Sequence, residues 1–265
     1  MRFYACYAFD LDGTLYRGNQ PIKGAVNTVF ELKNRGAKIL YVSNNSSLTN
    51  HGYVEKLVSL GFPADETWVR SSAIAAGEWL RTQSLQTLFV VGEPGLVQTL
   101  TLMGFTVINA DTKGNVEPLY PSHFHLHADA VVTGICKKNL SYPLLDSAMQ
   151  HIKLGAKFVA TNGDASFPLE GRRFSPGAGA TVAFLETCCG VKPHVTGKPR
   201  PEILLEGLKN IGICPEDCLM VGDRNDTDIE CGITAGCDSA LVQTGVDFSS
   251  TTATYTIESV ENLLT

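Results

Sequence analysis

The chain has 265 residues, of which 44% are hydrophobic and 18% charged, and its formal net charge is -6. This balance is typical of a globular protein with a large core rather than of a disordered or fibrous chain. The negative charge argues against a surface for nucleic acid or an anionic membrane, because both require a basic field. No segment has the roughly 18 uninterrupted apolar residues that a membrane helix needs.

The cellular compartment is predicted from the N-terminus and the cysteines. The first apolar stretch is only about seven residues long and ends in acids, so we expect no signal peptide. The eight cysteines form no C-x-x-C pair and are scattered through predicted strands and helices. We therefore expect a cytoplasmic protein with reduced thiols.

Short β-branched or aromatic runs alternate with longer amphipathic stretches at both ends of the chain. Residues 4–11 and 37–43 read as strands, and residues 24–36 and 50–61 read as helices. The same alternation returns between residues 201 and 245. Strand-helix alternation predicts an α/β fold with a parallel sheet, and we expect both ends of the chain to share it.

A second strand-helix series lies between these ends and is large enough to form a domain. We interpret it as an inserted α/β domain of residues 84–190, which leaves a core made of residues 1–83 and 191–265. The alternative is one long sheet that runs through the whole chain.

Polar residues follow four of the predicted strands. They are Asp10 and Asp12; Ser43, Asn44 and Asn45; Lys198; and Asp223 with Asp228. Each group alone is also common in turns and helix caps. However, the carboxyl ends of parallel strands meet at one edge of a sheet, where ligands bind.

The concentration of acids at one sheet edge predicts a cation. Several carboxylates placed together repel one another unless a positive charge compensates them. Hard oxygen ligands favour Mg²⁺, which is usually held by one or two carboxylates together with water and substrate phosphate. Lys198 and the Ser43 hydroxyl are then available to bind phosphate oxygens.

Four motifs carry a family resemblance. The stretches "DLDGT" at residue 10, "VSNNS" at 42, "GKP" at 197 and "VGDRNDTDI" at 221 resemble, in this order, the motifs of the haloacid dehalogenase superfamily of phosphatases. The inserted segment, with "TNGDASFPLEGRRFSPGAGA" from residue 161, resembles the large cap of the NagD-type and p-nitrophenyl phosphate phosphatases. The resemblance implies a doubly wound, Rossmann-like parallel-sheet core with an inserted α/β cap.

The resemblance implies different roles for the first two acids. Asp10 would be the nucleophile that forms an aspartyl-phosphate, and Asp12 would be the general acid and then the general base. Physical chemistry agrees, since a carboxylate is ionised at neutral pH and needs no activating base. The backbone carbonyl of Asp12 would also contact Mg²⁺.

The other motif residues would bind phosphate or metal. By the same resemblance, Gly13 allows a sharp turn beside the phosphate, while Ser43 and the segment with Asn44 and Asn45 bind phosphoryl oxygens. Lys198 would neutralise charge on the transferring group. Asp223 would ligate Mg²⁺ directly, whereas Asp228 would either ligate it through water or pair with Lys198.

The implied activity is the hydrolysis of phosphate monoesters of small metabolites, such as sugar phosphates, with p-nitrophenyl phosphate as a substrate in vitro. Substrate contacts from the cap are expected at Asn162, Gly163 and Asp164; a local capping turn explains Asn162 and Asp164 equally well. Relatives with large caps often dimerise through them, which implies a possible homodimer.

Two alternatives remain open. A non-catalytic, receiver-like protein phosphorylated on aspartate would share the acidic cluster and the lysine, but such domains are about half this length. The alternating His123, His125 and His127 would present three imidazoles on one face of a strand and so could bind zinc. A polar loop explains the three histidines more simply.

Overall fold

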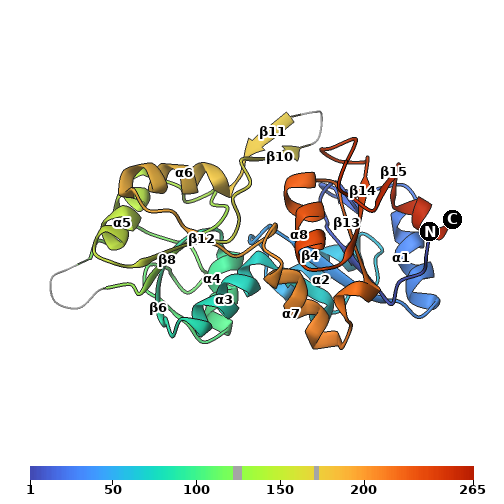
Figure 1. The fold of residues 1–265 in the computed structure, drawn as a ribbon. Coiled ribbons are helices and arrows are strands. Elements are labelled where there is room, and N and C mark those ends of the chain that lie inside the picture. Colours follow the sequence, from blue (N-terminus) through green and yellow to red (C-terminus); the bar gives the residue numbers. More distant parts are fainter. Residues whose placement is uncertain (122–126, 170–172) are drawn as a thin grey trace.

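The computed structural model describes residues 1–121, 127–169 and 173–265. Two separate parallel sheets organise these residues, one toward each end of the view in Figure 1. The N- and C-termini lie close together beside α1 (Ala25–Asn34). The α/β prediction is therefore confirmed, and the alternative of one long sheet is wrong.

The first sheet has six parallel strands in the order β15-β14-β13-β1-β4-β5. Its strands are β1 (Cys6–Phe9), β4 (Lys38–Ser43), β5 (Val69–Ser71), β13 (Cys218–Gly222), β14 (Asp238–Val242) and β15 (Tyr255–Ile257). Strand order reverses at β1, which pairs with β4 on one side and with β13 on the other. Such a reversal creates a crevice at the carboxyl ends of the strands, where open α/β sheets bind ligands.

Helices cover both faces of this sheet, as the doubly wound prediction requires. Alternate residues of β1 face opposite ways, so that Tyr7 and Phe9 pack with α1 and α2 (Asn50–Ser59). Cys6 and Ala8 pack on the other face with α7 (Glu202–Ile211). The short α8 (Glu230–Thr234) belongs to this second face.

The second sheet has five strands in the order β12-β9-β8-β6-β7, again parallel. Its strands are β6 (Thr87–Val91), β7 (Thr106–Val107), β8 (Ala130–Thr133), β9 (Lys157–Ala160) and β12 (His194–Val195). Its helices are α3 (Ser72–Thr82), α4 (Pro94–Leu102), α5 (Tyr142–Lys153) and α6 (Ala178–Cys189). A separate hydrophobic core joins these helices to the sheet.

The remaining elements are short. They are the hairpins β2 (Tyr16–Arg17) with β3 (Gln20–Pro21) and β10 (Ser166–Leu169) with β11 (Arg173–Pro176), the 3-10 turns η1 (Glu66–Trp68), η3 (Pro215–Asp217) and η5 (Val260–Leu264), and the π-helical turn η4 (Asn225–Ile229). Figure 1 shows the β10-β11 hairpin reaching from the second sheet toward the first. Among the described residues, no helix is long and apolar enough to cross a membrane.

The division into a core of residues 1–83 and 191–265 and a cap of residues 84–190 stays a prediction. The second sheet extends beyond the predicted end, because β12 pairs with β9. On the N-terminal side, Ala73, Ala76 and Leu80 of α3 pack in the core of the second sheet. We call the body around the second sheet the cap and the body around the first sheet the core.

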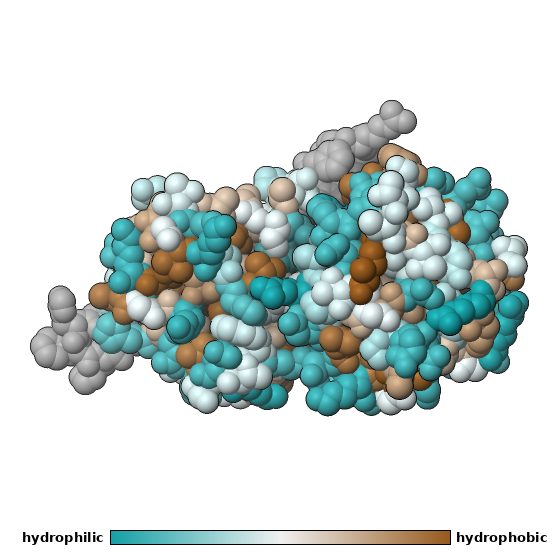
Figure 2. Space-filling view, in the orientation of Figure 1, coloured by the Kyte–Doolittle hydropathy of each residue, from teal (hydrophilic) through white to brown (hydrophobic). Residues whose placement is uncertain are grey.

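The surface drawn in Figure 2 is mostly hydrophilic, with hydrophobic residues scattered over both bodies. The most exposed of the large hydrophobic side chains belong to different regions: Leu102 at the end of α4, Tyr142 at the start of α5 and Phe248 after β14. Single exposed hydrophobic side chains are normal on soluble proteins and by themselves mark no interface.

Candidate active site

Three neighbouring strands of the core bring the predicted acids and hydroxyl together. Asp10 directly follows β1, and its backbone N–H donates to the carbonyl of Val221 in β13 at 2.8 Å. Ser43 is the last residue of β4, and Asp223 directly follows β13. The site therefore lies at the carboxyl edge of the sheet, next to the strand where the order reverses.

Lys198 lies between two of the acids. Its Nζ is 2.6 Å from Oδ1 of Asp10 and 2.8 Å from Oδ1 of Asp228, and it donates to the carbonyl of Val42 at 2.8 Å. The residue is only 2% exposed. Burial alone would lower its pKa, but the two carboxylates outweigh burial and raise it. Lys198 is thus held in its charged form.

Asp10, Asp223 and Asp228 form the acidic cluster. Each offers a carboxylate oxygen, and these oxygens lie within 4.8 Å of one another. Burial and the neighbouring acids together raise the pKa of Asp10 to about 7 and that of Asp223 to about 8, although the charge of Lys198 opposes the increase. Buried carboxylates that resist ionisation at this spacing fit a hard divalent cation such as Mg²⁺.

The turn after β13 aims Asp228 back at the cluster. Oδ2 of Asp228 accepts the backbone N–H groups of Asp223 and Arg224, each at 3.1 Å. A Cβ at Gly222 would lie 2.2 Å from the Asp228 side chain, so only glycine leaves room. Gly13 has φ +92°, and a Cβ there would lie 2.6 Å from Oδ2 of Asp223. Gly13 therefore sets the turn and leaves space for a neighbouring carboxylate.

The carboxylate of Asp12 is separate from this cluster and remains exposed. Partial desolvation by the surrounding protein raises its pKa, while the charges of Lys56, Lys137 and Lys198 lower it. Lys137 follows β8, so that the cap contributes positive charge to this side of the site. A solvent-accessible acid with a raised pKa suits proton transfer.

The loop after β4 holds the predicted phosphate-binding residues. Ser43 is buried, and its Oγ accepts the N–H of Asn45 at 3.2 Å and the hydroxyl of Tyr53 at 3.4 Å. The side chain of Asn45 accepts the N–H of Ser47 at 2.9 Å. These bonds fix the loop at the sheet edge.

Asn44 joins the loop to two other segments. Its Oδ1 accepts the N–H of Lys198 at 2.7 Å, and its Nδ2 donates to the carbonyl of Lys198 at 3.0 Å. The same Nδ2 lies 3.2 Å from Oδ1 of Asp164 in the cap. Both polar atoms of the Asn44 side chain are thus already hydrogen-bonded to other residues of the protein. This favours a role in positioning Lys198 over contact with substrate.

The predicted cap residues reach the site and also form a local turn. Asn162 donates from Nδ2 to the carbonyl of Asn44 at 2.7 Å, and its Oδ1 accepts the N–H of Asp164 at 3.1 Å. Burial raises the pKa of Asp164, while Arg224 and Lys198 lower it. Gly163 is exposed. Substrate contact by these three residues stays a prediction.

Sequence reasoning missed the loop after β14. The hydroxyl of Thr244 donates to the carbonyl of Gly13 at 2.7 Å, and the N–H of Val246 donates to Oδ2 of Asp223 at 2.8 Å. A Cβ at Gly245 would collide with Asp223. The rule that functional residues follow strands would have found this loop, because residues 239–245 read as a strand followed by glycine.

Sequence reasoning also overlooked Arg224, which links core and cap. Its Nη1 donates to the carbonyl of Ser166 in the β10-β11 hairpin at 3.5 Å.

The alternative zinc site is untested, because His123 and His125 lie outside the described residues. His127 is described and is exposed.

Comparisons with known proteins agree with this geometry. A haloacid dehalogenase-like hydrolase model matches residues 7–106, and a HAD-hydrolase-like model matches residues 195–263. The acid sugar phosphatase of Staphylococcus epidermidis is 36% identical over 247 residues, which are 93% of this chain and 89% of that protein. This chain belongs to the haloacid dehalogenase-like hydrolases.

Other relatives indicate to which subgroup of the family this chain is similar. The 5'-nucleotidase YutF of Bacillus subtilis is 36% identical and covers 93% of this chain and 90% of its own length. The glycerol phosphate phosphatase Rv1692 of Mycobacterium tuberculosis, solved in complex with magnesium, has a TM-score of 0.85 at 31% identity, covering 98% of this chain and 76% of its own. NagD from E. coli K-12 has a TM-score of 0.82 at 27% identity, with 98% of both chains covered.

These comparisons confirm the predicted NagD-like subgroup and the enzyme class. This chain is therefore a phosphoric monoester hydrolase. They give no support to a non-catalytic, receiver-like protein.

Proposed function

We propose that the enzyme hydrolyses phosphate monoesters of small metabolites through an aspartyl-phosphate on Asp10, with Mg²⁺ bound at the acidic cluster. The observation that carries this proposal is the buried Lys198 held between Asp10 and Asp228 beside Asp223. A structural ion pair needs only one carboxylate for one lysine, whereas here three carboxylates face a single ammonium group. The excess negative charge would be compensated by a bound cation, which can in turn bind a phosphoryl group.

The metal would be held by Asp10, Asp223 and Asp228, with the Asp12 carbonyl as a further oxygen ligand. When bound, it supplies positive charge that lowers the pKa values of the cluster and offsets the charge of the phosphoryl group. This role agrees with the magnesium complex of the glycerol phosphate phosphatase relative. A crystal structure with Mg²⁺ bound would distinguish direct ligation by Asp228 from ligation through water.

In the first step, a carboxylate oxygen of Asp10 attacks phosphorus while the bond from phosphorus to the leaving oxygen breaks. Asp12, in its neutral form, gives its proton to that oxygen, and the alcohol leaves. Lys198 keeps its proton throughout and stabilises charge shared between Asp10 and the phosphoryl oxygens. Ser43 and the amides of the following loop orient those oxygens.

In the second step, water attacks the phosphorus of the aspartyl-phosphate. Asp12, now a carboxylate, accepts a proton from that water, and the bond between phosphorus and the Asp10 oxygen breaks. Inorganic phosphate and the original carboxylate are released. Asp12 ends the cycle protonated, as it began.

The proposed substrates are sugar phosphates or similar small phosphorylated metabolites, with no role for nucleic acid or membranes. Acid sugar phosphatase and 5'-nucleotidase are the names of two relatives, so sugar phosphates and nucleoside monophosphates are the first compounds to test. The cap turn at Asn162, Gly163 and Asp164 is the proposed place for contacts with the leaving group.

The test measures phosphate release from p-nitrophenyl phosphate and then from a panel of phosphorylated metabolites, with and without Mg²⁺. We expect metal-dependent turnover that Asp10→Asn abolishes. Asp226→Asn is the matched control, because Asp226 lies in the same motif as Asp223 and Asp228 but is 69% exposed. Equal activity of Asp10→Asn and the native enzyme would refute the proposal.

Two further proposals concern location and assembly. All eight cysteines are free, as a reducing cytoplasm would keep them, and we propose that location. A homodimer formed through the cap is proposed from the family resemblance alone.

A further inference from the structure

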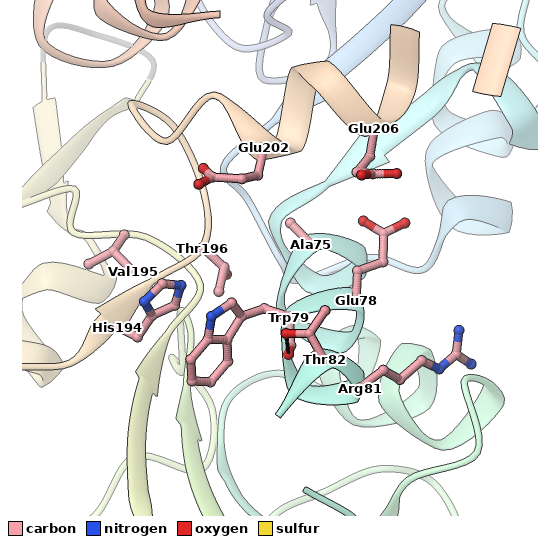
Figure 3. Close-up of a pocket in the computed structure, with 10 residues that line it drawn as sticks. All are labelled: Ala75, Glu78, Trp79, Arg81, Thr82, His194, Val195, Thr196, Glu202 and Glu206. Carbon is pink, nitrogen blue, oxygen red and sulfur yellow. Dashed lines mark hydrogen bonds between the residues drawn. The ribbon is translucent and has the colours of Figure 1, made fainter. Parts of the chain in front are cut away.

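A pocket of about 320 Å³ lies between α3, β12 and α7, apart from the acidic cluster. Its volume falls within the range of about 300 to 1,000 Å³ that is usual for small-molecule sites. Figure 3 shows side chains from all three elements converging on it. None of the residues that line it belongs to the predicted catalytic or metal-binding set.

The base of the pocket is apolar and aromatic. Ala75 and Trp79 come from α3, and Val195 comes from β12. The indole of Trp79 stacks on the imidazole of His194, with ring centroids 4.1 Å apart and planes 15° apart. This stack presents a rigid flat surface that suits an apolar or aromatic ligand.

The rim of the pocket is negatively charged. Glu78, Glu202 and Glu206 line it, and Figure 3 shows the carboxylates of Glu78 and Glu206 facing each other. The one lining residue with a permanent positive charge is Arg81, which donates to the carbonyl of Met103 at 2.6 Å and points away from the indole. The nearby positive charge of Arg200 also acts on His194, but the three carboxylates of the lining outnumber these cations, so the pocket is complementary to a cation.

The three glutamates differ in how far they are already neutralised. Glu78 forms a two-bond ion pair with the buried Arg70, and Glu206 lies 3.2 Å from the exposed Lys209. Glu202 has no ion pair or side-chain hydrogen bond with any residue that the structure describes. Glu202 is exposed, whereas Glu78 and Glu206 are half-buried, and Figure 3 shows its carboxylate on the same side of α7 as the stacked rings, so it is the glutamate most accessible to a ligand.

Two walls of the pocket run directly into the active site. Helix α3 begins at Ser72, whose hydroxyl donates to the carbonyl of Asn44 at 2.6 Å. Strand β12 continues through Thr196, a pocket residue, to Lys198. The third wall, α7, packs in the core and β12 pairs in the sheet of the cap, while α3 packs against both bodies, with Ala75 in the core cluster and Ala76 in the cap cluster. A ligand here would thus touch both bodies where the chain passes between them.

We propose that this pocket binds a small organic cation with an aromatic or apolar body, placed on the Trp79-His194 stack with its ammonium group at Glu202. We propose also that its occupancy changes turnover at the active site. The second part rests on the proposed function, and the first does not.

Binding is tested with 2-phenylethylamine, using its neutral analogue 2-phenylethanol as the matched ligand. Ligand-observed NMR titration of the Mg²⁺-loaded full chain should give saturable binding of the amine and about tenfold weaker binding of the alcohol. Glu202→Gln should weaken the amine about tenfold and leave the alcohol unchanged. Glu258→Gln, which removes an exposed acid elsewhere, should change neither.

The same titration can overturn the site. Absence of saturable amine binding, equal affinity for amine and alcohol, or an unchanged affinity in Glu202→Gln would each contradict it. Trp79→Leu, checked for native circular dichroism, should weaken both ligands, because it removes the stacking surface.

The coupling is tested by steady-state hydrolysis of p-nitrophenyl phosphate with increasing 2-phenylethylamine. We expect kcat or KM to change by about fivefold at saturation in the native enzyme but not in Glu202→Gln at the same concentration. Saturable binding with unchanged kcat and KM would refute the coupling between the pocket and the active site, while the proposed binding site would still stand. An enzyme that hydrolyses no phosphate ester would refute the proposed function and the coupling together, while the binding result would stand.

Discussion

Lys198 carries the electrostatic balance of the site, because one buried ammonium group faces two carboxylates. Its contacts with Asp10 and Asp228 are short, and Lys198 and Asp228 are almost completely buried. Removing one member of a buried ionic group leaves the other charges without compensation, which costs more than an exposed ion pair contributes.

Lys198→Met should therefore damage both stability and catalysis. We expect a loss of about 3 to 5 kcal/mol in the free energy of unfolding, measured in urea without metal. We also expect kcat to fall on the order of a thousandfold, because the charge that stabilises the transferring group is gone. Lys209→Met, which removes an exposed lysine, should leave both quantities nearly unchanged.

The two acids of the first motif should separate in kinetics. Asp12→Asn should still accept phosphate from p-nitrophenyl phosphate, because nitrophenolate leaves without a proton, but should hydrolyse the phospho-enzyme slowly. Rapid-quench measurements should show a burst of nitrophenolate followed by slow turnover. Native steady-state turnover in Asp12→Asn would rule out the role given to this residue.

At the residue scale, sequence reasoning succeeded where a side chain lies at the end of a strand or directly after it. Asp10, Ser43 and Asp223 all lie at the predicted sheet edge, because position in a parallel strand determines where the next residue lies. The bridging role of Asn44 was not predictable in this way. Its partners, Lys198 and Asp164, are more than a hundred residues away in sequence, and such pairing leaves no local pattern.

At the scale of elements, Asn44 links the loop after β4 to the segment before α7 and to the cap turn. Replacing it by alanine would leave the N–H and carbonyl of Lys198 without these partners. A buried polar group without a partner costs about 1 to 3 kcal/mol.

Asn44→Ala should lower the free energy of unfolding by about 2 kcal/mol or more and reduce kcat, since the lysine would lose its fixed backbone. Urea denaturation and steady-state kinetics measure the two effects. Asn34→Ala, at the exposed end of α1, is the control. A change in KM alone would instead favour the predicted role of Asn44 in binding substrate.

The boundary between cap and core is harder to predict from sequence than the strands and helices themselves. Alternating apolar runs indicated the strands and helices of both sheets. However, the predicted cap ends at residue 190, while β12 at His194–Val195 still pairs with β9. A two-residue strand has too little periodicity to be read from sequence, because its existence depends on the partner strand.

At the scale of the whole molecule, the acidic cluster makes metal-free stability depend on pH. The pKa values of Asp10 and Asp223 are raised in the folded state, to about 7 and about 8. In the unfolded chain both groups titrate near about 3.9. The folded state therefore binds more protons, and stability falls as pH rises from about 4 through the folded pKa values.

Mg²⁺ should reverse this loss, because it compensates the ionised carboxylates. We expect the metal to raise the melting temperature more at about pH 8.5 than at about pH 6, by scanning calorimetry. Asp223→Asn should melt higher than the native chain without metal at the higher pH and should gain little from Mg²⁺. An increase from Mg²⁺ that does not vary with pH would contradict this electrostatic interpretation.

The central claim is that Asp10 becomes covalently phosphorylated during turnover. The most direct test mixes enzyme, Mg²⁺ and a phosphate ester, stops the reaction with acid within one turnover, and locates the added phosphate by mass spectrometry of the digested chain. We expect phosphate on Asp10 in the native enzyme, more of it in Asp12→Asn, and none in Asp10→Asn. Phosphate on another residue, or turnover in Asp10→Asn at the native rate, would contradict it.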